Sequence, residues 1–394
     1  MKKFNRILFY ITLIISFSSC NTKGQESVQI LSDTTELNTQ VITDSLGKKE
    51  VSLLFLGDIM QHGLQIESAY NSATKKYDFT SQFKYVKPIF EKTDIVVGNL
   101  EVTFGGPPYD GYPKFSSPNS LGNAIKNAGI NYLVMSNNHV YDRDKAGFEN
   151  TIRVVDSLGL KRTGTFYDYA DKKKNHPMII EKEGFKIALF NYGYGVNDNF
   201  YEVPNMINFL DKDSIKNDLQ TATTKSYDAI IVMMHWGEEY ERQPDSLQLD
   251  LTNFCLENGA DILIGSHSHV INRMEHYSYK SNKVEEKEVL VAYSLGNFVS
   301  NYGKWRYCDG GTMVKFTLTK EKNKKLKIEN PEYQLIWVYR PIKSGKLRYH
   351  YVLPFNKAGN NYKMRDSDRN QLNVFLKDSR ELLNKQNIGV KESE

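Results

Sequence analysis

Side chains that can bind metal ions stand in short clusters along this sequence, each directly after an apolar run. The clusters combine carboxylate, carboxamide and imidazole groups, and a glycine stands beside nearly every one of them. They are centred on Asp58, on Asn99 and Glu101, on Asn138 and His139, on His235, on His267 and His269, and on Asn297. Zinc, iron and manganese accept such a mixture of oxygen and nitrogen ligands. The pattern predicts a site for divalent metal ions, and a pair of ions in such a site suits phosphoryl chemistry.

Each of these residues also has a simpler explanation. A single histidine at the end of an apolar strand, such as His235, is more often an interior side chain with a hydrogen-bond partner than a ligand. The spacing of His267 and His269, two residues apart and close to glycine, favours metal binding for the three histidines together. An aspartate after a strand often caps the next helix, and for Asp142 that alternative stays open.

The elements that would position these side chains alternate between strands and helices. Short apolar runs predict strands at 51–56, 94–97, 132–135, 186–190, 229–234, 261–264 and 288–293. Lengths and spacings suited to amphipathic helices occur at 81–92, 118–128, 145–158, 212–225 and 246–258. This order indicates an α/β fold with helices on both faces of the strands, in which ligands bind beyond the carboxyl ends of the strands. We therefore expect the clusters to meet in one site.

The character of the sequence changes after Tyr302. Alternating apolar and polar residues predict strands at 311–320 and 333–339, and 366–384 has the spacing of a terminal amphipathic helix. We interpret 302–394 as C-terminal strands and a helix that complete the core. A separate, smaller antiparallel module is the alternative.

Composition indicates a folded, water-facing protein. Hydrophobic residues make up 40% of the 394 residues and charged residues 25%, close to a globular average. The formal net charge of +4 is too small at this length to indicate a nucleic-acid surface, and no nucleic-acid partner is expected.

The first twenty residues have the pattern of an export signal. A positively charged start precedes an apolar run at 7–17, which is too short to span a bilayer stably. Two serines and Cys20 follow, as at the site where bacterial lipoproteins are cleaved and acylated. We expect a lipoprotein signal peptide at 1–20, lipidation of Cys20 and a flexible polar tether at 21–50. The protein would then be anchored to a cell-envelope membrane by lipid; a plain secretory signal with an incidental cysteine is the alternative.

The order of the clusters is more specific than any one of them. The motifs GD, GNLE, NNHxxD, HWG, GSHSHV and YSLGNF follow one another from Asp58 to Phe298. This series resembles the CapA-like capsule-synthesis (poly-gamma-glutamate biosynthesis) family of the calcineurin-like metallophosphoesterase superfamily, over 51–301. The resemblance implies a metallophosphatase-like β-sandwich flanked by helices on both faces.

The resemblance also implies roles for individual residues. By that resemblance the metal ligands would be Asp58, Glu101, Asn138, His235, His267 and His269. Glu101 would be the carboxylate that bridges two ions. His139 would act beside them, protonating a leaving oxygen or bonding the phosphoryl group, and Asp142 could orient it. Asn99 and Asn297 would hold a ligand in place or contact the substrate.

The first motif departs from the superfamily's pattern. A histidine normally stands two residues after the aspartate, and here that residue is Met60. His62 could replace it only if the chain reversed to turn this side chain inward. Glu101 stands where an aspartate is usual, and its extra methylene would change the metal spacing. The site could therefore hold one ion or two, of manganese, iron or zinc.

These expectations combine into two hypotheses. The first is an exported, metal-dependent phosphoesterase or related hydrolase that acts on a cell-envelope polymer or its phosphorylated precursor, with capsule-synthesis membrane proteins as possible partners. The second, motivated by Met60, is a non-hydrolytic accessory subunit that binds or conveys a polyanionic surface polymer. The substrate itself is not readable from the residues.

Overall fold

The computed structural model describes residues 48–198, 200–303, 305–321 and 325–394, and Lys48–Glu394 forms one compact unit. The expected signal peptide, the lipidation of Cys20 and most of the tether at 21–50 lie outside the described residues. Within the described ranges, no helix has both the length and the apolar character needed to cross a membrane.

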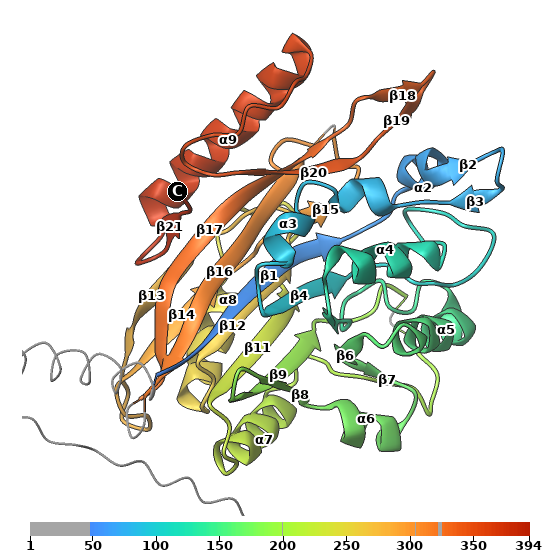
Figure 1. The fold of residues 1–394 in the computed structure, drawn as a ribbon. Helices are drawn as coiled ribbons and strands as arrows, with labels where there is room; N and C mark the ends of the chain where they lie inside the picture. The colour runs from blue at the N-terminus through green and yellow to red at the C-terminus, as the bar shows by residue number, and fades with distance from the viewer. Residues whose placement is uncertain (1–47, 199, 304, 322–324) are drawn as a thin grey trace, which may run out of the picture. The chain divides into compact units, whose positions relative to one another are not determined.

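Two large sheets organise this unit (Figure 1). The first sheet contains, in order, β20 (Tyr351–Phe355), β17 (Lys327–Tyr339), β16 (Gly310–Lys320), β1 (Lys49–Ile59), β4 (Ile95–Leu100), β5 (Tyr132–Val134) and β6 (Lys161–Thr163). β15 (Asn297–Val299) pairs with β1, and β21 (Lys391–Glu392) pairs with β17. The second sheet contains β13 (Met274–Tyr279), β14 (Lys287–Ala292), β12 (Ile262–His267), β11 (Ala229–Trp236), β9 (Phe185–Gly193) and β8 (Met178–Lys182).

Helices and short hairpins complete the unit. The helices are α2 (Gly63–Ala69), α3 (Lys87–Phe90), α4 (Ser120–Ala128), α5 (Asp144–Ser157), α6 (Tyr169–Asn175), α7 (Lys212–Thr223), α8 (Ser246–Glu257), α9 (Asp366–Gln386) and the 3-10 helix η1 (Thr80–Phe83). The short strands pair as β2 (Tyr70–Asn71) with β3 (Lys76–Tyr77), β7 (Thr165–Phe166) with β10 (Met206–Ile207), and β18 (Ile342–Ser344) with β19 (Leu347–Arg348).

The hydrophobic core lies in three layers, because alternate residues of each central strand face opposite sides. Leu53 and Phe55 of β1 pack with Ile231 and Met233 of β11 between the two sheets. Their neighbours in sequence face outward to helices: residues such as Leu54 pack in the cluster that contains α4 and α5, and those such as Val232 in the cluster that contains α7 and α8. The expected sandwich with helices on both faces is confirmed.

Apart from the β18–β19 hairpin, the strands after Tyr302 belong to the first sheet. β16 pairs antiparallel with β1 along its length, from Lys49 opposite Lys320 to Leu56 opposite Met313. β17 and β20 extend the sheet beyond β16, and α9 adds apolar side chains to the cluster between the sheets. These strands therefore share one core with β1.

One expected helix is wrong. Residues 81–92 do not form a single helix but the 3-10 turn η1 followed by the four residues of α3. Pro88 stands in the first turn of α3, where its missing N–H costs nothing. Further along a continuous helix the same ring would clash with a preceding carbonyl, so the helix starts anew at this point.

Candidate metal centre

The site lies where the ends of strands from both sheets meet. Asp58 stands near the end of β1, and Glu101 directly follows β4. His235 lies near the end of β11, and His267 is the last residue of β12. Strands β1 and β4 run parallel to each other, as do β11 and β12, so each sheet brings its pair of ends to one edge.

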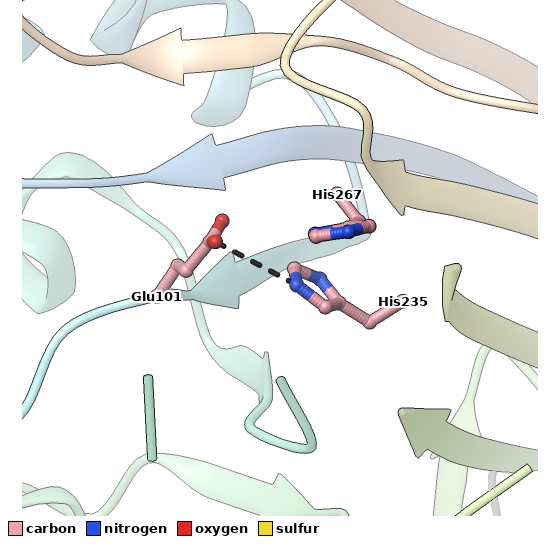
Figure 2. Close-up of side chains that lie close together, drawn as sticks. All are labelled: Glu101, His235 and His267. Carbon is pink, nitrogen blue, oxygen red and sulfur yellow. Dashed lines mark ion pairs between the residues drawn. The ribbon is translucent and has the colours of Figure 1, made fainter. Parts of the chain in front are cut away.

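One candidate metal group joins Glu101, His235 and His267, which Figure 2 shows facing one another. One ligand atom from each lies within 4.8 Å of the others. Glu101 Oε1 is 3.6 Å from His235 Nε2, and that same nitrogen is 2.8 Å from Asn138 Oδ1. The carboxamide oxygen of Asn138 therefore lies within reach of this group.

A second candidate group joins Asp58, Glu101 and His269, again with one ligand atom from each within 4.8 Å of the others. His269 Nδ1 lies 3.4 Å from Asp58 Oδ2. Glu101 belongs to both groups, which is the position that a bridging carboxylate requires. All six residues expected as ligands thus lie in one buried cluster.

Three polar atoms at the centre have no hydrogen-bond partner among the described residues. Both carboxylate oxygens of Glu101 and Nδ1 of His267 are buried without a hydrogen bond in the described residues. Burial and the charge of Asp58 raise the pKa of Glu101 well above its ordinary value. Burial and the neighbouring His269 lower the pKa of His267 to about 3. Buried donors and acceptors are normally satisfied, so this cluster fits cations that would bind those atoms.

The backbone at His267, the last residue of β12, and at His269 is unusual. His267 has a backbone φ of +95° and His269 a φ of +58°, values that residues other than glycine rarely adopt. Such conformations cost about 1–3 kcal/mol each and are frequent at active sites and ligand-binding sites. The turn thus directs two imidazoles from neighbouring positions into the same cluster.

Two asparagines hold candidate ligands in place. Asn99 Nδ2 donates to Asp58 Oδ1 over 2.8 Å, and Asn297 Oδ1 lies 3.1 Å from His269 Nδ1. Both asparagines are buried, with 1% and 0% of their surfaces exposed. Of the two roles expected for them, these contacts favour holding a ligand over contact with substrate.

His139 and Asp142 form a buried pair beside the cluster. His139 Nδ1 lies 2.7 Å from Asp142 Oδ2, and the same oxygen accepts the backbone N–H of Phe115 over 2.8 Å. A proton on Nδ1 would donate to Asp142 and leave Nε2 available for chemistry. Asp142 does not cap the next helix, because α5 begins at Asp144 with Arg143 as its N-cap residue.

Met60 and His62 both lie outside the two candidate groups. Met60 is buried in the cluster between the first sheet and its helices. His62 Nδ1 accepts the backbone N–H of Asn301 over 3.2 Å, and its ring packs edge-on against Tyr302. His62 is half-buried. Neither residue replaces the missing ligand.

Two supporting residues were not expected from the sequence. Ser266 Oγ lies 3.0 Å from His235 Nδ1 and can accept a hydrogen bond from a proton on that nitrogen. The other ring nitrogen, Nε2, then faces Glu101 without a proton. Asn197 Oδ1 accepts from Asn138 Nδ2 over 3.1 Å, and its Nδ2 lies 3.1 Å from His139 Nδ1. Asn197 lies in the segment after β9, and no polar cluster was expected at the end of the corresponding predicted strand, 186–190.

Two capsule-synthesis proteins of Bacillus species are similar in sequence to this chain. It is 29% identical over 276 residues to the PGA biosynthesis protein CapA of Bacillus subtilis (strain 168), covering 68% of each chain. It is 26% identical over 285 residues to the capsule biosynthesis protein CapA of Bacillus anthracis, covering 68% of this chain and 64% of that one. The present chain thus spans less than two thirds of the second relative's length.

Solved structures give weaker matches. The NAD nucleotidase (NadN) of Haemophilus influenzae matches with a TM-score of 0.46 and 12% identity, over 88% of this chain and 58% of that one. The calcineurin-like phosphoesterase YfkN of Bacillus subtilis matches with a TM-score of 0.43 and 13% identity, over 85% of this chain and 98% of that one. Both TM-scores lie below 0.5, so the assignment rests on sequence.

The decisive match is to a family model. The model described as bacterial capsule synthesis protein PGA_cap matches residues 52–302, which include every residue of the two candidate metal groups. The chain therefore belongs to the bacterial capsule synthesis protein family.

Proposed function

We propose that this protein is a metal-dependent phosphoesterase, or a related hydrolase, that acts on a polymer of the cell envelope or on its phosphorylated precursor. The observation that carries the proposal is the pair of ligand groups that share Glu101. The carboxylate of Glu101 is buried among three histidines, and neither of its oxygens has a hydrogen bond among the described residues. Such a group is costly to bury alone, and a bound cation would offset that cost.

The chain's own residues supply the remaining parts of such a site. Manganese, iron or zinc ions, one or two, would neutralise charge on a phosphoryl group and make water a better nucleophile at neutral pH. Asp58, Glu101, Asn138, His235, His267 and His269 would hold them. His139, oriented by Asp142 through Nδ1, would present Nε2 to protonate the leaving oxygen.

The cleft beside these residues is open enough to admit a substrate. A cavity of about 350 Å³ is lined by Asn138, His139, Asp142 and Asn197, with Lys114 at its wall. His139 therefore borders both the ligand cluster and a space that a phosphoester could enter.

We further propose that Cys20 carries a lipid that anchors the protein to a membrane of the envelope. The support is the charged start, the short apolar run and the small residues before Cys20. Capsule-synthesis membrane proteins are the proposed partners at that location, in line with the family to which the chain belongs.

The test is metal analysis of the full chain, purified in mild detergent without chelator. We expect bound manganese, iron or zinc, and loss of that metal in Asp58→Ala and His267→Ala with circular dichroism unchanged. His176→Gln is the matched control, because His176 is buried against Asp218 and belongs to neither metal group. Metal-dependent turnover on phosphomonoester, phosphodiester and nucleotide panels would support the hydrolase. Absence of metal even after loading would contradict it.

A non-hydrolytic accessory role is the second candidate. The observation that favours it is Met60, whose side chain is buried in the core where the superfamily's pattern has a ligand. Under this hypothesis the protein would bind metal weakly or not at all, and would co-purify with a polyanionic polymer or with a synthesis partner. Co-purification that yields neither would count against it.

A further inference from the structure

A large cavity adjoins the candidate metal centre. Its volume is about 840 Å³, within the range of sites that enclose small ligands. Tyr112 lines both this cavity and the smaller one that contains His139. The Tyr302 ring lies 5.0 Å from the His269 ring, centre to centre. A ligand in the cavity would therefore extend from the proposed reaction site.

One wall of the cavity is an aromatic platform. Tyr240 and Trp305 stack with ring centres 5.1 Å apart and an angle of 12° between the planes. Trp305 is 56% exposed although it is a large apolar side chain, and such residues are usually covered. Tyr240 occupies one face of the indole, so stacking on this pair would take place from one side.

Another wall carries positive charge. Arg340, Arg348 and Arg365 line the cavity together with the carboxylate of Asp368. Arg365 forms two hydrogen bonds to the carboxylate of Asp368, and Arg340 pairs with Asp309. Nη1 of Arg340 is buried and has no hydrogen bond among the described residues.

Arg348 is the least satisfied of these cations. Within the described part of the chain it forms no ion pair, and its guanidinium reaches only the carbonyls of Gly345 and Leu347, each at 3.4 Å. The guanidinium of Arg348, which is without an ion pair among the described residues, fits a carboxylate or phosphate group on a ligand.

We propose that this cavity is a binding subsite for an acidic saccharide, a sugar ring that bears a carboxylate or phosphate. The proposal rests on the proposed function in one respect: it takes the metal centre to be the place where one end of the bound ligand would react. A sugar ring would stack its C–H face on Trp305, and its hydroxyls would bond groups such as Asn301 and Gln371, which both donate and accept.

Other anionic ligands fit the walls less well. A linear polymer of glutamate has carboxylates for the arginines but no ring for the aromatic platform. A nucleotide has a flat base and a phosphate, but its hydroxyls are confined to the ribose, whereas every ring of a saccharide offers hydroxyls to the hydroxyl and amide side chains along the wall. The combination of platform, cations and uncharged polar groups favours the saccharide.

The test is binding to the full chain in mild detergent with metal removed by chelator, measured by calorimetry and by tryptophan fluorescence. Trp236 and Trp337 are buried, so a ligand in this cavity would mainly change the emission of Trp305. The probes are tetragalacturonate, neutral maltotetraose, γ-linked tetraglutamate and uridine monophosphate. We expect tetragalacturonate to bind at least about tenfold tighter than each of the others and to change the emission.

Substitutions locate the binding. Trp305→Ala and Arg348→Gln should each weaken tetragalacturonate about tenfold or more, in line with the loss of a charged hydrogen bond or a stacking partner. The matched controls are Tyr169→Ala and Arg153→Gln, which remove an exposed aromatic ring and an exposed guanidinium elsewhere and should change nothing.

Three results would overturn the proposal: tighter or equal binding of tetraglutamate, tighter or equal binding of the nucleotide, or unchanged affinity in both cavity variants. Because the assay uses metal-free protein, its failure would leave the metal centre and its hydrolase function untouched. Loss of the metal centre in the analysis above would likewise leave this subsite standing.

Discussion

Glu101→Gln should make the metal-free protein more stable, although it removes a residue common to both candidate metal groups. In the native chain two buried carboxylates, Glu101 and Asp58, lie close together, and neither oxygen of Glu101 has a hydrogen bond among the described residues. A glutamine at this position would be neutral, and its amide would offer a donor toward Asp58 in place of repulsion.

The size of the gain follows from the cost of an unsatisfied buried group. That cost is about 1–3 kcal/mol, and more for a charged group. With an unfolding entropy of about 2.1 cal/mol/K per residue over Lys48–Glu394, each kcal/mol moves Tm by roughly 1.4 °C. The metal-free variant should therefore melt roughly 1–4 °C above the native protein.

The gain should depend on pH in a definite direction. Burial raises the pKa of Glu101 in the folded state, so the folded protein binds its proton more tightly than the unfolded chain does. The native protein then loses stability as pH rises above about 4.5, the ordinary value for glutamate, until the folded state also ionises. The advantage of Glu101→Gln should be smallest in acid and largest above neutrality.

The assay is thermal unfolding by calorimetry, with and without added manganese or zinc. Metal at one hundred times its Kd should stabilise the native protein by about 2.7 kcal/mol per site and the variant by much less. The order of the two proteins should therefore reverse when metal is added. If Glu101→Gln were less stable than the native protein without metal at every pH, the reasoning would be refuted, because Glu101 would then be a structural residue.

Three further predictions concern other groups. Asp142→Asn should lower kcat by about 10- to 100-fold with metal content unchanged, since it disturbs the proton position on His139; equal loss of metal would contradict it. Burial and the charge of Arg340 lower the pKa of His350 to about 3. As the pH falls, His350 of the unfolded chain therefore takes up a proton before His350 of the folded protein does. The native protein should lose about 2 kcal/mol more than His350→Gln between pH 7.5 and pH 5, measured by urea unfolding; parallel curves would contradict it. Gly265→Ala should prevent folding or destabilise strongly in a protease-sensitivity assay, because its Cβ would lie 1.9 Å from a backbone carbonyl oxygen; native-like resistance would contradict it.

Much of the site could be predicted because parallel strands deliver their last residues to one edge. Asp58, Glu101, His235 and His267 were found from apolar runs that end in polar residues, and they meet as expected. The strands run further than predicted: β4 ends at Leu100 rather than at residue 97, and β12 at His267 rather than at residue 264. The glycines in these motifs resemble loop residues in sequence, but here they continue the strands.

The remaining features depend on contacts between distant segments. The cavity joins Tyr240 and Trp305, from two separate loops, with Arg348 of the β18–β19 hairpin, and no local pattern relates the three segments. Asn197 follows β9 in a segment that has no polar cluster like those after the other strands. Its role is visible only in the structure, where its side chain contacts Asn138. The prediction of one helix at 81–92 was wrong because it followed the spacing of apolar residues and gave too little weight to Pro88, which begins a new helix.

The division of the metal groups between two sheets has a consequence for how the protein matures. Asp58 and Glu101 come from the first sheet, whereas His235, His267 and His269 come from or follow strands of the second. A cation bound by both sets would join segments about 130 to 210 residues apart in the sequence, and would act as a cross-link of the kind that a long-range disulfide provides. Metal loading would then be a late event, possible only after both halves of the sandwich have come together. The same cross-link would resist their separation, so chelation should loosen the paired strand ends of both sheets at once.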